Sequence, residues 1–339
     1  SSDVCSSDQY TGKPDSYYNA IINWVKQRYD LIVTKEVINF VPGIVPGIGM
    51  AMNCFTQKGD KVMIQPPVYH PFAWVTTRNE RTLVINPLRW ENGMYRMDLD
   101  AFREQIKGCK LFILCNPHNP GGVVWTEAEL RAIADICYDE KVLVFSDEIH
   151  ADLTLPPHTH RPFATVSEKA RMNSVTFMSP SKAFNMPGLS ASHALIFNED
   201  LRKRFRIYMD AGELDMGHVF AFLSVEAAYS HGTEWLDQCL AYIQGNIDFV
   251  DEFLKKHAPK IKAIRPEASY LVWLDCRELE LSQKDLNEFF VDKAHLALND
   301  GEMFGKEGIG FMRLNVASPR CIIEKAMKQL ADAYQLYIK

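Results

Sequence analysis

The chain has 339 residues, of which 47% are hydrophobic and 24% are charged, and this balance excludes a disordered protein. Its formal net charge is −6 and its Lys and Arg residues are scattered, so nothing in the composition indicates a nucleic-acid partner. No apolar run reaches the length that spans a bilayer, and the chain is long enough to predict two packed domains.

The cysteines and histidines do not predict a metal site. The eight cysteines are dispersed without a Cys-x-x-Cys pair, a pattern that suits reduced thiols in the cytoplasm, where we expect the protein. His158-x-His160 can be interpreted as a pair of metal ligands. We favour a solvated loop after Pro156-Pro157, because no third ligand is placed nearby.

The N-terminal residues divide into two parts. Residues 1–8 are a polar near-repeat without helical or strand periodicity, and we expect a non-native leader there. Asp15 or Ser16 can cap an amphipathic helix that carries several large apolar residues, namely Tyr18, Ile21, Ile22, Trp24 and Val25. We expect residues 9–34 to pack with the smaller, C-terminal domain.

A Pro- and Gly-rich segment at 41–49 lies between a predicted strand at 37–40 and a helix predicted from Met50 to Phe55. Glycines before a helix start leave backbone N–H groups free for an anion, and the helix dipole supports binding. The candidate phosphate site is Gly43, Ile44 and Val45. A Pro/Gly turn without a ligand is an equally good interpretation of this segment.

The next strand, 61–65, ends at a loop that carries Tyr69. A tyrosine in this position can stack on a planar cofactor ring or can fill the core, and the core is the better interpretation until a ring is established. A further strand is predicted at 82–85 and a helix at 98–106.

Three apolar runs of strand length follow, at 111–115, 142–145 and 174–178, with a helix predicted between 126 and 139. Each is continuous, as parallel strands buried on both faces require. Each also ends on polar residues, and ligands of open parallel sheets bind at the carboxyl ends of the strands. The residues delivered to this edge are Asn119, Asp147, His150, Ser179, Ser181 and Lys182.

After a strand at 193–197 the chain becomes mainly helical, at 201–209, 219–229 and 235–256. Strands at 261–264, 270–274 and 310–315 alternate with helices at 283–294 and 319–337. We therefore expect a mostly parallel α/β domain at 35–232, a long interdomain helix at 233–258 and a smaller α+β domain at 259–339.

Lys182 has the surroundings of a reactive amine. Apolar neighbours disfavour its charged form, so its pKa falls and it can attack an aldehyde, which is how pyridoxal 5′-phosphate (PLP) is held. Asp147 can pair with the pyridine nitrogen of PLP or can cap a helix, and Asn119 can donate to the phenolic oxygen. His150 can contact the edge of the ring or can be a structural histidine.

The order and spacing of several motifs resemble the fold-type I PLP enzymes, the aspartate aminotransferase superfamily. The motifs are Asn119-Pro-Gly, Ser146-Asp-Glu-Ile-His150, Ser179-Pro-Ser-Lys182 and Met312-Arg-Leu-Asn315. More specifically, Pro-Gly-Ile-Val-Pro-Gly, Pro-Pro-Val-Tyr-His-Pro-Phe and Ala-Leu-Asn-Asp-Gly-x-Met-Phe-Gly resemble the cystathionine and cysteine-S-conjugate β-lyase branch, the MalY/PatB type. The resemblance extends from Tyr10 to the C-terminus.

The resemblance implies roles for individual residues. Lys182 would bond covalently to PLP and carry protons, and Tyr69 would stack on the ring. Arg313 would hold the α-carboxylate of the substrate as a bidentate fork, for which Lys is no substitute. Tyr10 would reach the phosphate of the neighbouring subunit of a homodimer. The remaining cofactor contacts would come from Gly43, Ile44, Val45, Asn119, Asp147, Ser179 and Ser181.

Two departures from the family pattern stand out. Many aminotransferases have Arg where this chain has Ser190, so phosphate binding would depend more on backbone amides and hydroxyls. The N-terminal arm that helps cover the active site in the family is absent or replaced by the leader, which bears on activity and dimerisation.

The resemblance implies a PLP-dependent carbon–sulfur β-lyase that converts L-cystathionine or a related cysteine S-conjugate to a thiol (homocysteine), pyruvate and ammonia. The alternative on the same residues is an aminotransferase. The alternative of another class is a catalytically inactive PLP-binding regulatory protein, or a truncated fragment.

Overall fold

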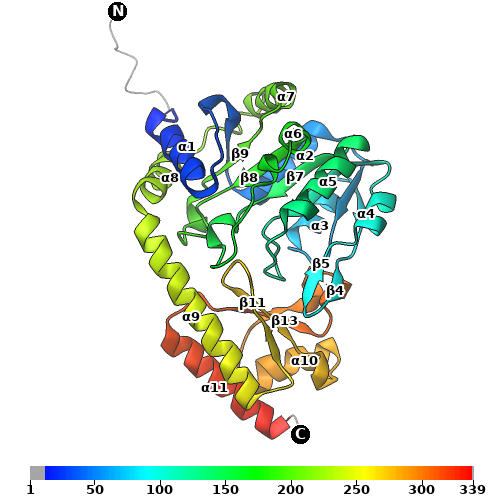
Figure 1. Ribbon diagram of the computed structural model, residues 1–339, viewed down its shortest axis with the longest axis vertical. Helices are drawn as coiled ribbons and strands as arrows, with labels where there is room; N and C mark the ends of the chain where they lie inside the picture. The colour runs from blue at the N-terminus through cyan, green and yellow to red at the C-terminus, as the bar shows by residue number, and fades with distance from the viewer. Residues whose placement is uncertain (1–11, 338–339) are drawn as a thin grey trace, which may run out of the picture.

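The computed structural model describes residues 12–337 (Figure 1). The expected leader at 1–8 and Tyr10 lie outside the described residues. The upper part of the molecule in Figure 1 contains one large sheet with helices around it, and the lower part contains a small sheet beside two long helices. This is the predicted pair of unequal α/β and α+β parts.

The large sheet has seven strands in the order β1-β9-β8-β7-β6-β2-β3. Every neighbouring pair is parallel except those that β9 makes with β1 and β8. The mostly parallel sheet is therefore confirmed. The strands are β1 (Ile38–Val41), β2 (Lys61–Ile64), β3 (Thr82–Ile85), β6 (Cys109–Cys115), β7 (Leu143–Asp147), β8 (Ser174–Met178) and β9 (Ser192–Leu195).

Helices cover both faces of this sheet: α2 (Ile44–Phe55), α3 (Pro71–Arg78), α4 (Leu99–Gln105), α5 (Glu127–Asp139), α6 (Glu168–Met172) and α7 (Glu199–Asp210). Thr126 caps α5 in a capping box with Glu129, as the residues predict. Helix α2 begins six residues earlier than predicted. Pro46 is tolerated there because its missing N–H falls in the first turn, where no intrahelical partner exists.

A short hairpin of β4 (Arg89–Glu91) and β5 (Met94–Arg96) was not predicted. Its turn is Asn92-Gly93, and both residues have positive φ angles of 50° and 81°. Asn-Gly is a strong sequence signal for such a turn, because both residues adopt this backbone conformation readily.

The small sheet has the order β10-β11-β13-β12, with every pair antiparallel: β10 (Lys262–Ile264), β11 (Leu271–Asp275), β12 (Asn299–Asp300) and β13 (Phe311–Asn315). Helix α10 (Gln283–Glu288) continues into a single π-helical segment at Phe289–Lys293. Helix α11 (Arg320–Tyr337) packs along α9 (Thr233–His257), the long helix that links the two parts (Figure 1).

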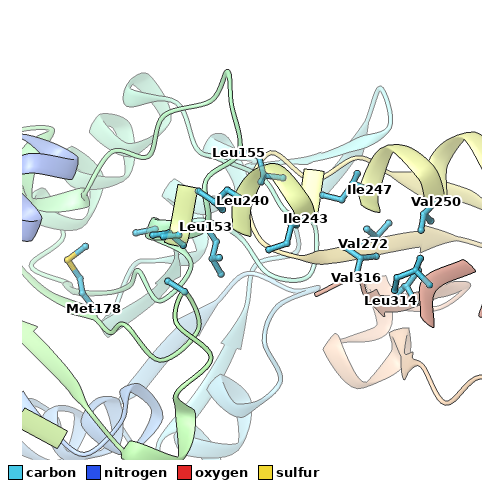
Figure 2. Close-up of a cluster of buried hydrophobic side chains, with 14 of the residues drawn as sticks. Leu153, Leu155, Met178, Leu240, Ile243, Ile247, Val250, Val272, Leu314 and Val316 are labelled. Carbon is cyan, nitrogen blue, oxygen red and sulfur yellow. The ribbon is translucent and has the colours of Figure 1, made fainter. Parts of the chain in front are cut away.

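One face of α9 fixes the two parts relative to each other. Its buried residues recur at helical spacing, at Leu240, Ile243, Ile247 and Val250. Figure 2 shows these side chains between strand residues of the small sheet and Leu153 and Leu155, which follow β7. The apolar core is therefore continuous across the boundary, and the cleft between the two sheets has a defined shape.

Helix α1 (Asp15–Tyr29) packs on α8 (Val219–His231), where Trp24 stacks on Tyr229 with ring centroids 4.7 Å apart. The Trp24 indole also donates to Asp152, 2.9 Å away. We expected this segment to pack with the small domain, and its main contacts lie with α8 instead, because Trp24 and its neighbours match the apolar face of that helix. For residues 35–339 we propose the predicted domain division.

Within residues 12–337, no helix combines the length and apolarity that crossing a membrane requires. The seven cysteines in this part of the chain are all free thiols.

Candidate active site

A cavity of about 440 Å³ lies where the carboxyl ends of the parallel strands face the small sheet. It brings together ten of the predicted site residues from segments more than 250 positions apart: Gly43, Ile44, Val45, Tyr69, Asn119, Asp147, His150, Ser181, Lys182 and Arg313. Ser179 is not among the residues that line it, and Tyr10 lies outside the described residues.

Lys182 follows β8 and is half-buried. Burial lowers the pKa of its amine, the Arg313 guanidinium lowers it further, and the Asp147 carboxylate opposes both effects. A lowered pKa leaves more of the amine unprotonated near neutral pH, which a nucleophile or a base requires.

Asp147 is the last residue of β7 and is 3% exposed. Burial raises the pKa of its carboxyl group to about 7, although the N–H of Ile149 donates to it at 3.1 Å and favours ionisation. No α-helix begins here, so the capping interpretation is not favoured. A cationic ring nitrogen in the cavity would be the natural partner of this carboxylate.

The neighbouring carboxylate is used differently. Glu148 turns away from the cavity and accepts from Ser146 Oγ and the Phe163 N–H, each at 2.8 Å, while its other oxygen lies 2.8 Å from His160 Nε2. This fully bonded carboxylate holds the loop after β7 in place, and so it positions Asp147.

The phosphate site predicted at Gly43 is the start of α2 rather than a loop. Gly43 is the N-cap with a φ of 132°, and Ile44 and Val45 occupy the first turn. Their N–H groups have no intrahelical partner, and the positive end of the helix dipole faces the cavity. Ser181, Ser190 and Ser192 add hydroxyl groups to the same cavity, so an anion can be bound there without an arginine.

Ser179 corrects one prediction. Its hydroxyl donates to the Ala191 carbonyl at 2.7 Å and accepts from the Ser181 N–H at 3.1 Å. Both bonds lie within the loops around Lys182, so Ser179 shapes those loops and does not present its hydroxyl to the cavity.

Tyr69 borders the cavity and is only partly buried, with its ring edge-to-face against Phe72 at 5.8 Å. Its ring also packs against the core beside the fully buried Phe72, so stacking of Tyr69 on a cofactor ring stays a prediction. Burial raises the pKa of the Tyr69 hydroxyl, so it stays protonated.

Arg313 comes from the small sheet and crosses to the large one. Its Nη1 donates to Asn119 Oδ1 at 2.9 Å and its Nη2 to Asn299 Oδ1 at 2.8 Å, with the guanidinium over the Phe304 ring. Burial lowers the pKa of Arg313 to about 10, so it remains charged at neutral pH. Its buried Nε has no partner within the described part of the chain.

His150 lines the cavity at 4% exposure, and burial lowers its pKa to about 3. It is therefore a neutral imidazole. Its Nδ1 is buried without a partner among residues 12–337, which favours a contact with a bound molecule over a satisfied structural histidine.

Several lining residues were not predicted, among them His70, Cys115, Tyr270 and Asn315. Tyr270 directly precedes β11 although it was included in the strand predicted at 270–274, and no local pattern distinguishes it from the strand residues that follow. Its ring faces His150 edge-to-face at 6.4 Å across the cleft.

The assembled groups fit a phosphorylated pyridine aldehyde. The cavity offers an amine of lowered pKa, a buried carboxylate for a ring nitrogen, an aromatic face and a helix start for the phosphate. Three buried polar atoms of the lining residues, His70 Nδ1, His150 Nδ1 and Arg313 Nε, have no partner within the described residues. These requirements are those of PLP and an amino-acid carboxylate.

No cluster of His, Cys, Asp or Glu that could hold a metal occurs in the described part of the chain. His158 and His160 diverge: His158 lies 3.8 Å from Glu267, and the buried His160 bonds Glu148.

Comparison with known proteins places these observations in a family. The family model described as aminotransferase class I and II matches residues 9–330. Cystathionine beta-lyase PatB from Bacillus subtilis is 37% identical over 326 residues, which cover 96% of this chain and 84% of that protein.

Two solved structures each superpose with a TM-score of 0.94 and cover 96% of this chain and 84% of their own. One is a PLP-bound protein from Clostridium difficile 630, described as an aminotransferase and 40% identical. The other is cystalysin from Treponema denticola, which contains a pyridoxal 5′-phosphate cofactor and is 34% identical.

Proposed function

This chain belongs to the class I and II aminotransferase family, and within it we propose that the chain is a PLP-dependent carbon–sulfur β-lyase. Its substrate would be L-cystathionine or a related cysteine S-conjugate. With one water, the substrate would yield a thiol, pyruvate and ammonia. The convergence of Lys182, Asp147 and Arg313 on one cavity supports a PLP enzyme, and the similarity to cystathionine beta-lyase PatB is the observation that favours elimination.

The chain provides a distinct group for each part of the cofactor. Lys182 would hold the aldehyde carbon, Asp147 the pyridine nitrogen and Asn119 the phenolic oxygen, with Tyr69 against the ring face. The phosphate would lie at the start of α2. When bound, PLP supplies an electron-withdrawing ring that stabilises negative charge developing at the substrate α-carbon.

The side chains would then act on the substrate directly. Arg313 would bind the α-carboxylate and so orient the α-hydrogen, and the Lys182 amine would remove that proton. Loss of the thiolate from the β-carbon would complete the elimination. The neutral His150 and Tyr270 line the same cavity.

Transamination on the same residues is the alternative function, and it would transfer the amino group of the substrate to the cofactor and release a keto acid instead of a thiol. The two are separated by supplying L-cystathionine without any keto acid and measuring thiol and pyruvate. Equal amounts of both, over many turnovers, are expected for a lyase. An aminotransferase would consume one equivalent of L-cystathionine per active site and continue only when a keto acid is added. A protein that catalyses neither elimination nor transamination would favour a regulatory role.

We also propose a cytoplasmic homodimer in which Tyr10 serves the neighbouring subunit. The free thiols of the described residues support the first point. Exposed apolar residues on one face of α8 support the second: Val219, Phe220 and Leu223, which are 39%, 67% and 50% exposed. Sedimentation equilibrium of the holoenzyme tests the dimer.

Arg313→Lys is expected to raise KM for L-cystathionine by about 10- to 100-fold, because a lysine cannot form the two parallel bonds that a guanidinium makes with a carboxylate. We expect kcat to change less, since the bond exists in both the bound substrate and the transition state. Steady-state pyruvate release measures both constants. Arg265→Lys, which alters an exposed arginine in the same domain, is the matched control. An unchanged KM in Arg313→Lys would refute the role of the Arg313 guanidinium in binding the substrate carboxylate.

A further inference from the structure

Asp152 joins helix α1 to the segment that carries His150. This segment follows β7 as a short 3₁₀ helix at Ala151–Leu153, for which His150 is the N-cap. The Asp152 Oδ1 accepts hydrogen bonds from the Trp24 indole N–H, at 2.9 Å, and from the Tyr29 hydroxyl. Both donors belong to α1 and lie 128 and 123 positions earlier in the chain. The contact therefore fixes the residues after β7 to a remote helix.

Helix α1 is a firm support for Asp152 because it is held by contacts of its own. It lies along α8 (Figure 1), and Trp24 is 1% exposed and stacked on Tyr229. The Arg28 guanidinium covers the Trp24 ring at 4.9 Å, and the Tyr29 ring meets the His160 ring edge-to-face at 5.4 Å. The two donors are thus in place whether or not Asp152 is present, so Asp152 is the partner that is held.

His150 lies midway between two anchored carboxyl groups. Glu148, two residues earlier, is bonded to His160, and Asp152, two residues later, is bonded to α1. The backbone adds bonds of 3.0 Å from the Ala151 N–H to the Glu148 carbonyl and from the Leu153 N–H to the His150 carbonyl. With both flanks fixed, the direction of the His150 imidazole is fixed too.

The direction of this imidazole matters because His150 has a polar atom to offer. The side chain lines the cavity, and its Nδ1 is buried without a partner among residues 12–337. Hydrogen bonds weaken steeply as their distance and angle change, so a small displacement of a contact group is costly. Asp152 is not among the residues that line the cavity, and it can affect a bound molecule only through its neighbours.

We propose that Asp152 is a positioning residue, which holds His150 against the bound cofactor by way of Trp24 and Tyr29 of α1. This inference rests on the proposed function, because that function places PLP in the cavity. The effect depends on an acceptor oxygen and not on charge, since both donors bond the same Oδ1 atom. It makes α1 part of the support of the active site.

The affinity of the PLP-free protein for PLP, measured by equilibrium dialysis, tests the role of Asp152 without turnover. Asp152→Ala should raise the dissociation constant about tenfold, the loss expected for one hydrogen bond to a misplaced group. Asp152→Asn should stay within about threefold of wild type, because its amide oxygen still accepts from both donors. Asp237→Ala is the matched control: Asp237 lies on α9 and binds Arg28 of α1 at 3.0 Å, so its loss loosens α1 alone and should leave the dissociation constant unchanged.

A double-mutant cycle separates positioning of His150 from general damage. In a His150→Phe background, Asp152→Ala should change the dissociation constant by less than about twofold, because the group that Asp152 positions is gone. Tyr29→Phe removes one donor hydroxyl and should show the same dependence on His150 with an increase of about threefold, which provides the test if Asp152→Ala does not fold. An equal increase in both backgrounds, no increase in either, or a loss in Asp152→Asn as large as in Asp152→Ala would overturn the proposal.

Turnover separates the failure of this inference from the failure of the lyase assignment. Under saturating PLP, Asp152→Ala should lower kcat for pyruvate release from L-cystathionine and keep KM within about twofold, since Arg313 is not altered. A lyase whose affinity for PLP does not depend on Asp152 would refute the positioning role and leave the proposed function intact. A protein that shows the coupling of Asp152 to His150 but releases no pyruvate would support the positioning role and refute the lyase.

Discussion

Replacing Lys182 by alanine is expected to lower pyruvate release from L-cystathionine by at least about 10³-fold, because one amine both holds the cofactor and moves the substrate proton. Alanine leaves the cavity otherwise intact, since Lys182 is half-buried and makes no hydrogen bond to another side chain among those found in residues 12–337. Pyruvate formation under saturating PLP measures the loss.

The covalent role has a readout independent of activity. Borohydride treatment of the wild-type holoenzyme should attach PLP permanently to one lysine, which mass spectrometry of the peptides will locate. Lys182→Ala should yield no such peptide, whereas Lys284→Ala, which alters an exposed lysine of α10, should behave as wild type. A stable adduct on another lysine, or residual pyruvate release within tenfold of wild type, would contradict the assignment.

Asp147→Asn is expected to reduce kcat/KM by about 10² to 10⁴-fold, the range typical of removing a group that acts on charge in the transition state. Asparagine has nearly the same shape as aspartate but cannot supply the negative charge that keeps a pyridine nitrogen protonated. We also expect the absorption band of the bound cofactor to shift, and the affinity of the variant for PLP to fall. Asp139→Asn, at an exposed position on α5, is the matched control.

Although Asp147→Asn should lower activity, it should raise the free energy of unfolding of the PLP-free protein. The pKa of Asp147 is raised to about 7 in the folded chain from its ordinary value of 3.8, because burial disfavours the carboxylate. The folded state therefore binds more protons between these two values, and its stability falls as pH rises through that window. Asparagine does not ionise and escapes this loss.

Urea unfolding of the PLP-free proteins should therefore show Asp147→Asn as more stable than wild type at pH 8, with the difference shrinking towards pH 4. With PLP bound, the order at pH 8 should reverse, since only the wild type has the charge that the ring requires. A wild-type protein that is the more stable form at pH 8 in both states would indicate that Asp147 is paired by another group.

Much of the site was predictable because its residues follow consecutive strands. Asn119 follows β6, Asp147 is the last residue of β7 and Lys182 follows β8, and these three strands are neighbours in the sheet. Continuous apolar runs predict parallel strands buried on both faces, and the carboxyl ends of such strands meet at one edge. The register confirms this, since Asp147 pairs with Cys115 on one side and Phe177 on the other.

The start of α2 and the role of Ser179 were not predicted correctly, because proline occurs both in turns and in the first turn of a helix, and a serine hydroxyl can bond either a ligand or the backbone. Pro46 lies in the Pro- and Gly-rich segment that predicts a helix only from Met50, yet proline costs little in the first turn of a helix, and α2 starts at Ile44. Ser179 has the right residue type and position for a phosphate ligand, but its hydroxyl is already bonded to Ala191. Composition and spacing do not reveal which partner a hydroxyl will choose.

Periodicity and turn chemistry act over a few residues, so the amino-acid order alone determined the strands, most helices and the polar groups at the strand ends. Packing decided what those groups face. Arg313 reaches Asn119 across 194 positions only because the core around Ile247 joins the two sheets. Such distances depend on the sum of many weak apolar contacts between remote segments, and no local stretch of sequence carries that sum.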